Sequence, residues 1–167
     1  MASRTRTEAV NVFLSRIQRQ LSCVTHDVVR VHGSYQAPDA RIDVYLAGGQ
    51  PVRLQGPERI HLRVRLRLQL TQVEESRGYW DADLAAYEYR LSDPDDREIL
   101  AYHWHPDGQS HVQTPHLHLG VAAAVGRVAL LTAHLPTGQV SARDVVRLAV
   151  ESFAVQPQRR DWAAILG

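Results

Sequence analysis

Residues 59–73 read RIHLRVRLRLQLTQV, and this stretch decides the fold. Aliphatic side chains occupy every second position from residue 60 to residue 70, and Arg, His or Gln fills the positions between them. A period of two places successive side chains on opposite faces of a strand. The segment is therefore predicted to be a long strand with one face in the core and the other in solvent.

Turn-forming residues separate further strand-like segments before and after this strand. The segments are 26–35, 41–49, 84–91, 97–105, 110–120 and 127–136. Two of the connections, QAPDA at 36–40 and SDPDD at 92–96, hold the Pro and Asp residues that favour tight turns. The sequence thus predicts a curved antiparallel sheet of about six or seven strands.

Helical patterns lie at both ends of the chain. TRTE at 5–8 has the form of a capping box, and apolar residues then recur at helical spacing over about 7–22. Ser141 precedes a second helix over about 142–154, and residues 159–166 form a short third one. We expect an α+β fold in which the helices pack against one face of the sheet.

The composition indicates a soluble domain. The 167-residue chain is 44% hydrophobic and 22% charged, in the globular range. No apolar run approaches ~20 residues, and the N-terminus lacks the apolar core of a signal peptide. We expect one cytoplasmic domain over residues 1–167 without membrane contact. The single cysteine, Cys23, excludes an internal disulfide.

Histidine is concentrated in residues 102–120, YHWHPDGQSHVQTPHLHLG, which hold five of the nine histidines. Four of them form two His-x-His pairs, His103/His105 and His116/His118. Residues two apart share a strand face, so each pair points to one side. If the loop is centred near Ser110, His105 faces His116 and His103 faces His118, with Cβ atoms ~5 Å apart. We expect these four imidazoles on one face of a hairpin.

Three interpretations of these histidines remain open. They can bind a divalent metal, with Asp107 as a possible carboxylate ligand and with His111 and His134 joining from the loop and the last strand. They can instead act as metal-free acid/base catalysts, as in RNA cleavage by 2′-hydroxyl attack. The third interpretation is structural, with the histidines as polar residues beside aromatic ones.

A row of arginines on the long strand is a candidate phosphate site. All 19 basic residues of the chain are Arg, whose rigid fork suits phosphate. Arg63, Arg65 and Arg67 share one strand face, and we call them the arginine row. The alternative is a solvated face on which these arginines pair with acids such as Glu74, Glu88 or Asp83.

Three motifs in residues 87–119 carry a resemblance to a known family. YEYRLSD starts at residue 87, ILAYHWHP at residue 99 and TPHLHLG at residue 114. The segment is similar to the small TumE-like toxins of bacterial toxin–antitoxin pairs, which share a tyrosine-rich strand and a PHxHxG strand. The resemblance implies a compact antiparallel α+β fold, an antitoxin partner and an RNA- or translation-directed activity. His103, His116 and His118 fall on the motif.

The preferred hypothesis is a toxin-like protein directed at RNA or nucleotides. His103, His105, His116 and His118 would be catalytic, and the arginine row would hold phosphate. The first alternative is a divalent-metal protein that uses the same histidines, and the second is a non-catalytic interaction module. Candidate partners are an antitoxin protein, RNA and a second copy of the chain. The sequence names no cofactor and does not decide whether the protein is an enzyme.

Overall fold

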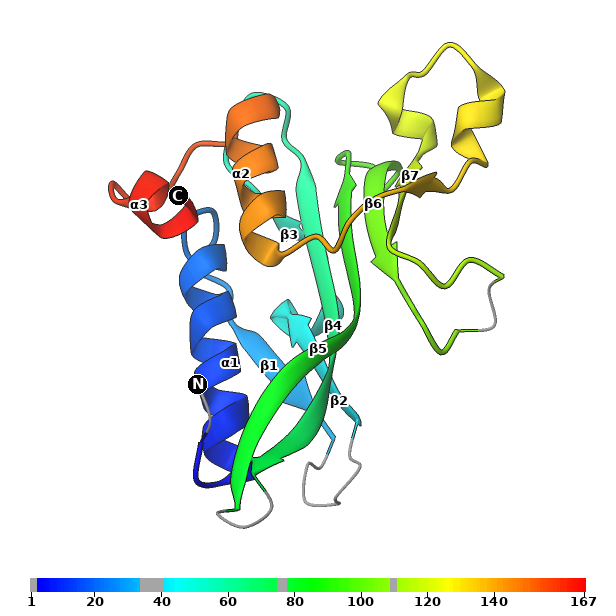
Figure 1. Cartoon of the computed structure of the whole chain (residues 1–167). Coiled ribbons are helices and arrows are strands. Elements are labelled where there is room, and N and C mark those ends of the chain that lie inside the picture. The colour runs from blue at the N-terminus through cyan, green and yellow to red at the C-terminus, as the bar shows by residue number, and fades with distance from the viewer. Residues whose placement is uncertain (1–2, 34–40, 75–77, 109–110) are drawn as a thin grey trace.

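A computed structural model describes residues 3–33, 41–74, 78–108 and 111–167, and Figure 1 shows its helices and strands. The α-helices are α1 (Arg6–Leu21), α2 (Ala142–Ser152) and α3 (Trp162–Leu166). The strands are β1 (Val29–His32), β2 (Arg41–Leu46), β3 (Val52–Arg53), β4 (His61–Glu74), β5 (Tyr79–Ser92), β6 (Glu98–Trp104), β7 (His116–Leu119) and β8 (Leu135–Pro136). Short 3-10 helices are η1 (Ala47–Gly49), η2 (Val121–Ala123) and η3 (Val128–Leu131). The predicted α+β class is confirmed.

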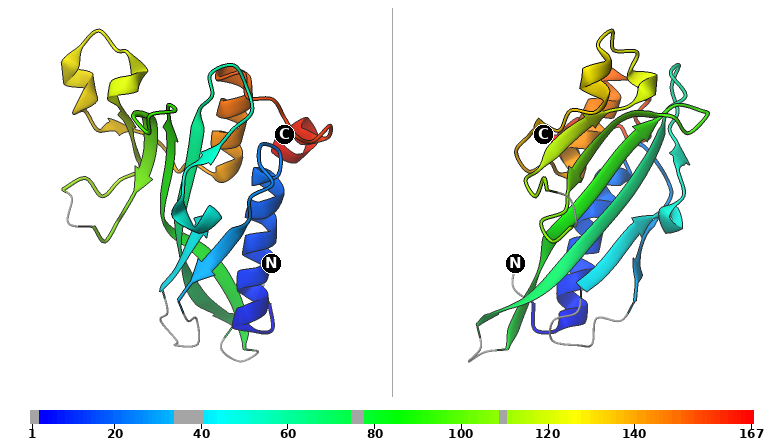
Figure 2. Two further views of the ribbon diagram at one scale, coloured as in Figure 1. Left: turned by 180° about the vertical axis from the view of Figure 1, so that it is seen from behind. Right: turned by 90° about the vertical axis from the view of Figure 1, so that its right-hand side faces the viewer.

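The strands form one open antiparallel sheet in the order β1-β2-β4-β5-β6-β7-β8, and β3 pairs with β4 off this path. The described strands number eight, more than the expected six or seven. Two of them, β3 and β8, have only two residues each and carry no alternation that a sequence could reveal. Figure 2 shows the strong twist of the long strands β4 and β5.

The alternation on β4 has the predicted consequence. Leu62, Val64, Leu66 and Leu68 are all at most 2% exposed, and the residues between them are half-buried or exposed. β4 pairs with β2 on one side and β5 on the other, so it lies in the interior of the sheet. The burial of its aliphatic face, at ~1.5–3 kcal/mol for each such side chain, anchors the fold.

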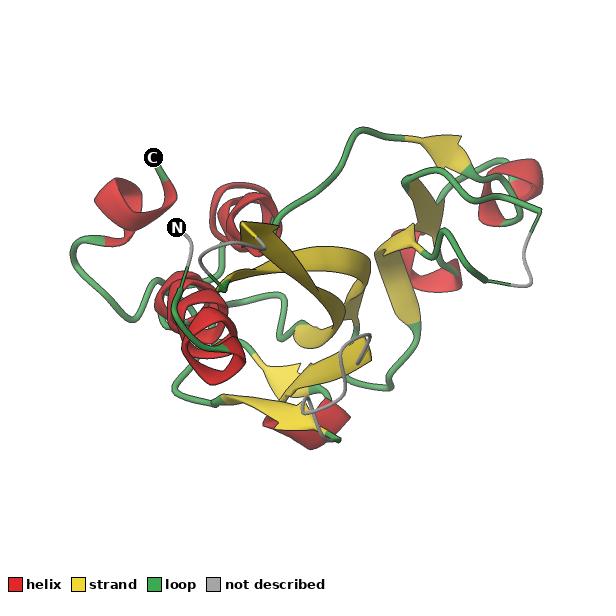
Figure 3. Ribbon diagram, turned by 60° about the horizontal axis from the view of Figure 1, so that its bottom comes forward, coloured by secondary structure: helices red, strands yellow, loops and turns green. Residues whose placement is uncertain are grey.

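The helices α1 and α2 cover the aliphatic face of the sheet, as Figure 3 shows from below. The apolar stripe of α1 is buried through Val10, Phe13 and Ile17, and that of α2 through Val145 and Ala149. Among the described elements, no α-helix packs against the opposite face of β4 and β5. That face carries charged residues such as Arg65 and Glu88, which pair across β4 and β5.

The caps of the two long helices differ. The Thr5 hydroxyl accepts a hydrogen bond from the Glu8 N–H, but the Glu8 carboxylate accepts from the Arg4 N–H. The expected reciprocal box is therefore only half formed there. Ser141 and Asp144 make the full box at the start of α2. α3 begins at Trp162, three residues later than the predicted segment, because Asp161 is its N-cap.

Two strand predictions near the histidines were wrong in extent. The predicted strand 127–136 instead contains the 3-10 helix η3, and only Leu135–Pro136 pairs with β7. Residues 121–131 instead project from the sheet, as the yellow segment of Figures 1 and 2 shows. The strand predicted at 110–120 begins only at His116, because Pro115 lacks the N–H that a ladder needs. The predicted turn 36–40 and Ser110 lie outside the described residues.

None of the described helices is long and apolar enough to cross a membrane.

Candidate metal centre

On the polar face of the sheet, cross-strand pairs connect the arginine row to the histidines. One row runs across four strands, because Arg65 pairs with Glu88, Glu88 with His103, and His103 with His116. Residues that pair directly in an antiparallel sheet lie on the same face. The charged part of this row lies on β4 and β5, and the imidazole part on β6 and β7.

The predicted pairing of the histidines was wrong, although their common face was right. His103 pairs with His116, and His118 pairs with Ala101. β6 ends at Trp104, so His105 lies beyond the ladder and has no partner within it. The actual register differs from the predicted one by two residues. Because side chains alternate with a period of two, that shift leaves the histidines on the same face.

Five imidazoles gather at this end of the sheet, and we call them the histidine cluster: His103, His105, His116, His118 and His134. The ring centroid of His103 lies 5.5 Å from that of His105, 5.8 Å from that of His116 and 5.0 Å from that of His118. His134 adds a ring at 5.0 Å from His116 and 4.4 Å from His118. The expected convergence of the four hairpin histidines is thus present.

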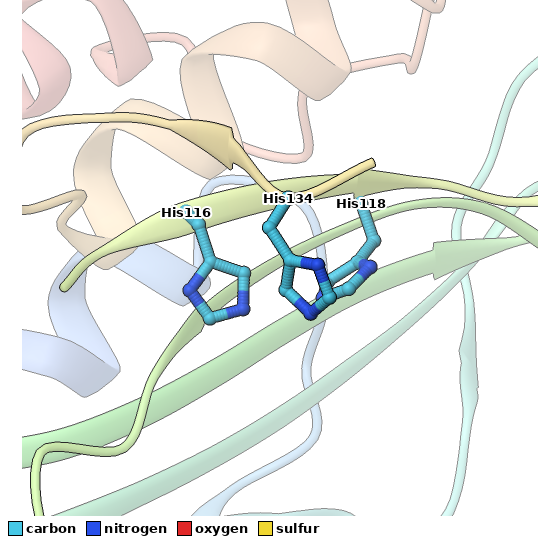
Figure 4. A group of neighbouring side chains, drawn as sticks. All are labelled: His116, His118 and His134. Carbon is cyan, nitrogen blue, oxygen red and sulfur yellow. The ribbon is translucent and has the colours of Figure 1, made fainter. Parts of the chain in front are cut away.

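Three members of the cluster have the arrangement of metal ligands. The ligand atoms of His116, His118 and His134 all lie within 4.8 Å of one another, and Figure 4 shows the three rings on the same side of β7. We call these three residues the three-histidine group. Nitrogens bound at ~2.1 Å around a tetrahedral ion lie ~3.4 Å apart. The rings therefore need to approach by only ~1 Å to share one ion.

A backbone hydrogen bond orients the ring of His116. It is 5% exposed, and its Nδ1 lies 2.7 Å from the carbonyl oxygen of Thr114. A carbonyl oxygen only accepts, so Nδ1 donates this hydrogen bond, and Nε2 is the ring nitrogen left to face a metal. An N–H to backbone contact of this kind orients histidine ligands in metal sites.

Burial keeps other members of the cluster uncharged. Desolvation, followed by the neighbouring imidazoles His118, His105, His116 and His134, lowers the pKa of His103 to about 3. Burial also lowers the pKa of His105, despite the nearby Glu88 carboxylate, and the pKa of His118. At neutral pH these imidazoles offer lone pairs rather than acidic protons, which suits metal binding.

The remaining predicted residues are placed less favourably for a metal. Asp107 is 62% exposed and forms an ion pair with Arg41 at 2.9 Å. It does not belong to the metal-ligand group found among the described residues. His111 is exposed, and its ring centroid lies 5.7 Å from that of His134.

Every arginine of the arginine row lies beside an acid, as the solvated-face alternative expects. Glu88 is one of the acids expected from the sequence, whereas Asp83 instead accepts a hydrogen bond from Thr71. The side chain of Glu74 lies outside the described part of the structure. The nearest N–O distances are 3.5 Å for Arg63–Asp96, 3.6 Å for Arg65–Glu88 and 2.8 Å for Arg67–Asp43.

Sequence reasoning named His134 only as an addition to the four hairpin histidines, and it left Glu88 out of the proposed site. His134 reaches the cluster because the short β8 returns alongside β7, and two strand residues give no detectable periodicity. The position of Glu88 on the polar face could have been inferred from its neighbours in the sequence. It lies between Tyr87 and Tyr89, both of which are 1% exposed, so a strand must turn Glu88 to the other face.

No family model matches the chain, and neither the curated proteins nor the solved structures contain a significant match to it.

Proposed function

We propose that the protein binds one divalent transition-metal ion through the three-histidine group. The observation that carries this proposal is the approach of the ligand atoms of His116, His118 and His134 to within 4.8 Å of one another. Imidazole nitrogen is a preferred ligand of Zn²⁺ and of neighbouring transition metals. Zinc is the best candidate, because three neutral imidazoles and one further ligand complete its tetrahedral shell.

Three protein ligands leave a coordination position for water or for a substrate atom. In such sites the metal lowers the pKa of bound water to near neutrality and polarises an oxygen of the substrate. In this chain, Thr114 would hold the ring of His116 in place, and the ring of His103 would lie against that of His118 without being one of the three ligands. This arrangement supports hydrolytic chemistry rather than a purely structural zinc, which is usually enclosed by four protein ligands.

The RNA-directed, toxin-like activity stays a prediction. It needs one imidazole that donates a proton and one that accepts a proton near neutral pH. Burial lowers the pKa values of His103, His105 and His118, so these rings are poor proton donors at pH 7. Metal binding needs the uncharged rings that burial favours, and this is why we place it first.

The test is a zinc titration of the untagged protein after treatment with EDTA, followed by calorimetry and elemental analysis. We expect one zinc ion per chain. The single variants His116→Ala, His118→Ala and His134→Ala should each weaken binding by at least ~10- to 100-fold, since even indirect support of a ligand has effects of that size. His26→Ala is the matched control, because His26 is exposed and is separated from the cluster by more than 70 residues of sequence.

Substitution of Zn²⁺ by Co²⁺ gives a second readout, because the visible absorption of Co²⁺ reports its coordination number. A tetrahedral spectrum that is lost in His134→Ala would support the three-histidine group. Sub-stoichiometric zinc in the wild type, or equal affinities in His26→Ala and the three ligand variants, would sink the proposal.

A further inference from the structure

A cleft of about 200 Å³ opens on the polar face next to the histidine cluster. His105 belongs to both, since it lines the cleft and its Nε2 lies 3.4 Å from Nδ1 of His103. The opposite wall is formed by β4 and by the neighbouring strand β2. The polar side chains that line the cleft are Asp43, Tyr45, Arg65, Arg67, Glu88 and His105.

Two guanidinium groups in this cleft have unused donors. Within the described part of the chain, Arg65 donates no hydrogen bond, and its only ion pair, to Glu88, spans 3.6 Å. Arg67 is bonded to Asp43 through Nε at 2.8 Å, which leaves both of its terminal nitrogens without a bond to any described residue. The side chains of Arg65 and Arg67 are 47% and 43% exposed, so a ligand can reach them.

Arg63, the third member of the arginine row, differs from them. Its side chain is only 18% exposed, it is paired with Asp96, and it does not line the cleft. The two available arginines are neighbours on one strand face, ~6.6–7 Å apart along the chain. Arginine forks bind carboxylate and phosphate through parallel N–H bonds, which gives such a pair a clear ligand class.

The size of the cleft limits what it can hold. Sites for drug-sized ligands occupy ~300–1,000 Å³, so a cleft of about 200 Å³ suits one end group of a molecule. Asp43 and Glu88 balance the charges of Arg65 and Arg67. Binding must therefore come from directional hydrogen bonds and from any positive charge added nearby, which the proposed metal would supply.

We infer that this cleft binds the anionic end group, a carboxylate or a phosphate, of the small molecule on which the metal centre acts. The orientation of that molecule toward the histidines rests on the proposed function, whereas anion binding by Arg65 and Arg67 does not. The arginine row and β7 are separated by three strand spacings of ~4.8 Å, or ~14 Å. A ligand anchored at Arg65 must span a distance of this order to reach the metal.

The test uses phenyl phosphate and benzoate, which present the two anionic groups on the same ring. Each is titrated into the metal-free, full-length protein while the Nε–H signals of the arginines are followed by NMR. We expect the signals of Arg65 and Arg67 to shift. Arg65→Gln should weaken binding at least ~10-fold, since a hydrogen bond to a charged group is worth that factor or more. Arg65→Lys keeps the charge but loses the fork, so its affinity for the probes should lie between that of the wild type and that of Arg65→Gln.

Arg160→Gln is the matched control, because Arg160 is an exposed arginine beyond α2 and outside the cleft. The probe that binds more tightly identifies the end group. Absence of binding by both probes, or equal affinity in Arg65→Gln and Arg160→Gln, would overturn the inference.

A second titration in the presence of zinc tests the link to the metal. A doubly charged ion ~14 Å away in water should raise the affinity about threefold for benzoate, which carries one negative charge, and by a larger factor for phenyl phosphate, which carries close to two. Unchanged affinity in zinc-loaded protein would overturn the assignment of the cleft to the ligand of the metal centre. Failure of zinc binding with intact probe binding would refute the proposed function alone, because the metal-free titration does not depend on it.

Discussion

Gly120 decides how tightly β7 is held against β6, and its replacement by Ala should loosen the edge that carries the histidines. A Cβ added to Gly120 would lie 2.0 Å from the carbonyl oxygen of Glu98. A carbon and a carbonyl oxygen approach no closer than ~3.3 Å, so the backbones must separate by more than ~1 Å. The φ of Gly120 is −88°, which any residue adopts, so the effect is steric rather than conformational.

The size of the effect follows from two contributions. Overpacking of a close contact typically destabilises by ~1–3 kcal/mol. The N–H of Gly120 donates to the Ile99 carbonyl at 2.9 Å, and a shift of ~1 Å breaks that bond, with a further loss of ~0.5–1.5 kcal/mol. We therefore expect Gly120→Ala to lower the free energy of unfolding by ~2–4 kcal/mol and to weaken zinc binding, since His118 is two residues away.

Urea denaturation followed by tryptophan fluorescence measures this change. Gly138→Ala is the control, because nothing lies within 4 Å of a Cβ at that position and its backbone is not left-handed. We expect the control to stay within ~0.5 kcal/mol of the wild type. If Gly120→Ala is as stable as Gly138→Ala, the packing of Gly120 against Glu98 described above is wrong, and with it the register that places His118.

Two further predictions concern the polar face. The folded-state pKa of His103 is about 3, below the ordinary 6.5, so the unfolded chain takes up this proton first as the pH falls. In metal-free protein, stability should thus drop below pH 6.5 by up to ~1.4 kcal/mol per pH unit, less for partial exposure of the ring. His103→Asn should flatten the drop relative to His26→Asn in urea titrations from pH 7.5 to 4.5, and equal slopes would contradict the burial of His103. If the arginine row holds phosphates, its replacement by Gln should lower the slope of log affinity against log salt concentration for RNA binding by up to ~2–3. The exposed pairs of Arg65 and Arg67 should each contribute less than ~1 kcal/mol to stability. Identical salt slopes in binding titrations, or no RNA binding by the wild type, would leave the row as an ion-paired strand face.

The long elements could be predicted from the sequence because their side chains repeat over many positions. β4 alternates from residue 60 to residue 70, and the buried stripe of α1 recurs at helical spacing over four turns. The short elements could not be predicted in this way. β3 and β8 have two residues each, and their existence depends on a partner strand that is distant in the chain.

The candidate site was predictable to the same degree. The common face of His116 and His118 follows from the period of two, which is a local property. His103 shares that face only because the register of β6 and β7 pairs it directly with His116. That pairing is not a local property, because the end of β6 at Trp104 and the late start of β7 after Pro115 set the register. The contribution of His134 depends on the return of β8 to β7, a tertiary contact with no local pattern.

The contrast between the two halves of the polar face argues against a purely structural role for the histidines. On β4 and β5 the face is built from ion pairs such as Arg65–Glu88, whose charged groups are well hydrated and stay charged at neutral pH. On β6 and β7 the same row continues as His103 and His116, two stacked rings with centroids 5.8 Å apart. Burial lowers the pKa of His103 to about 3, so this ring gives the surface no charge at pH 7 and destabilises the fold in acid. Further ion pairs would serve a solvated face better, whereas neutral imidazoles held close together provide what a metal ion requires.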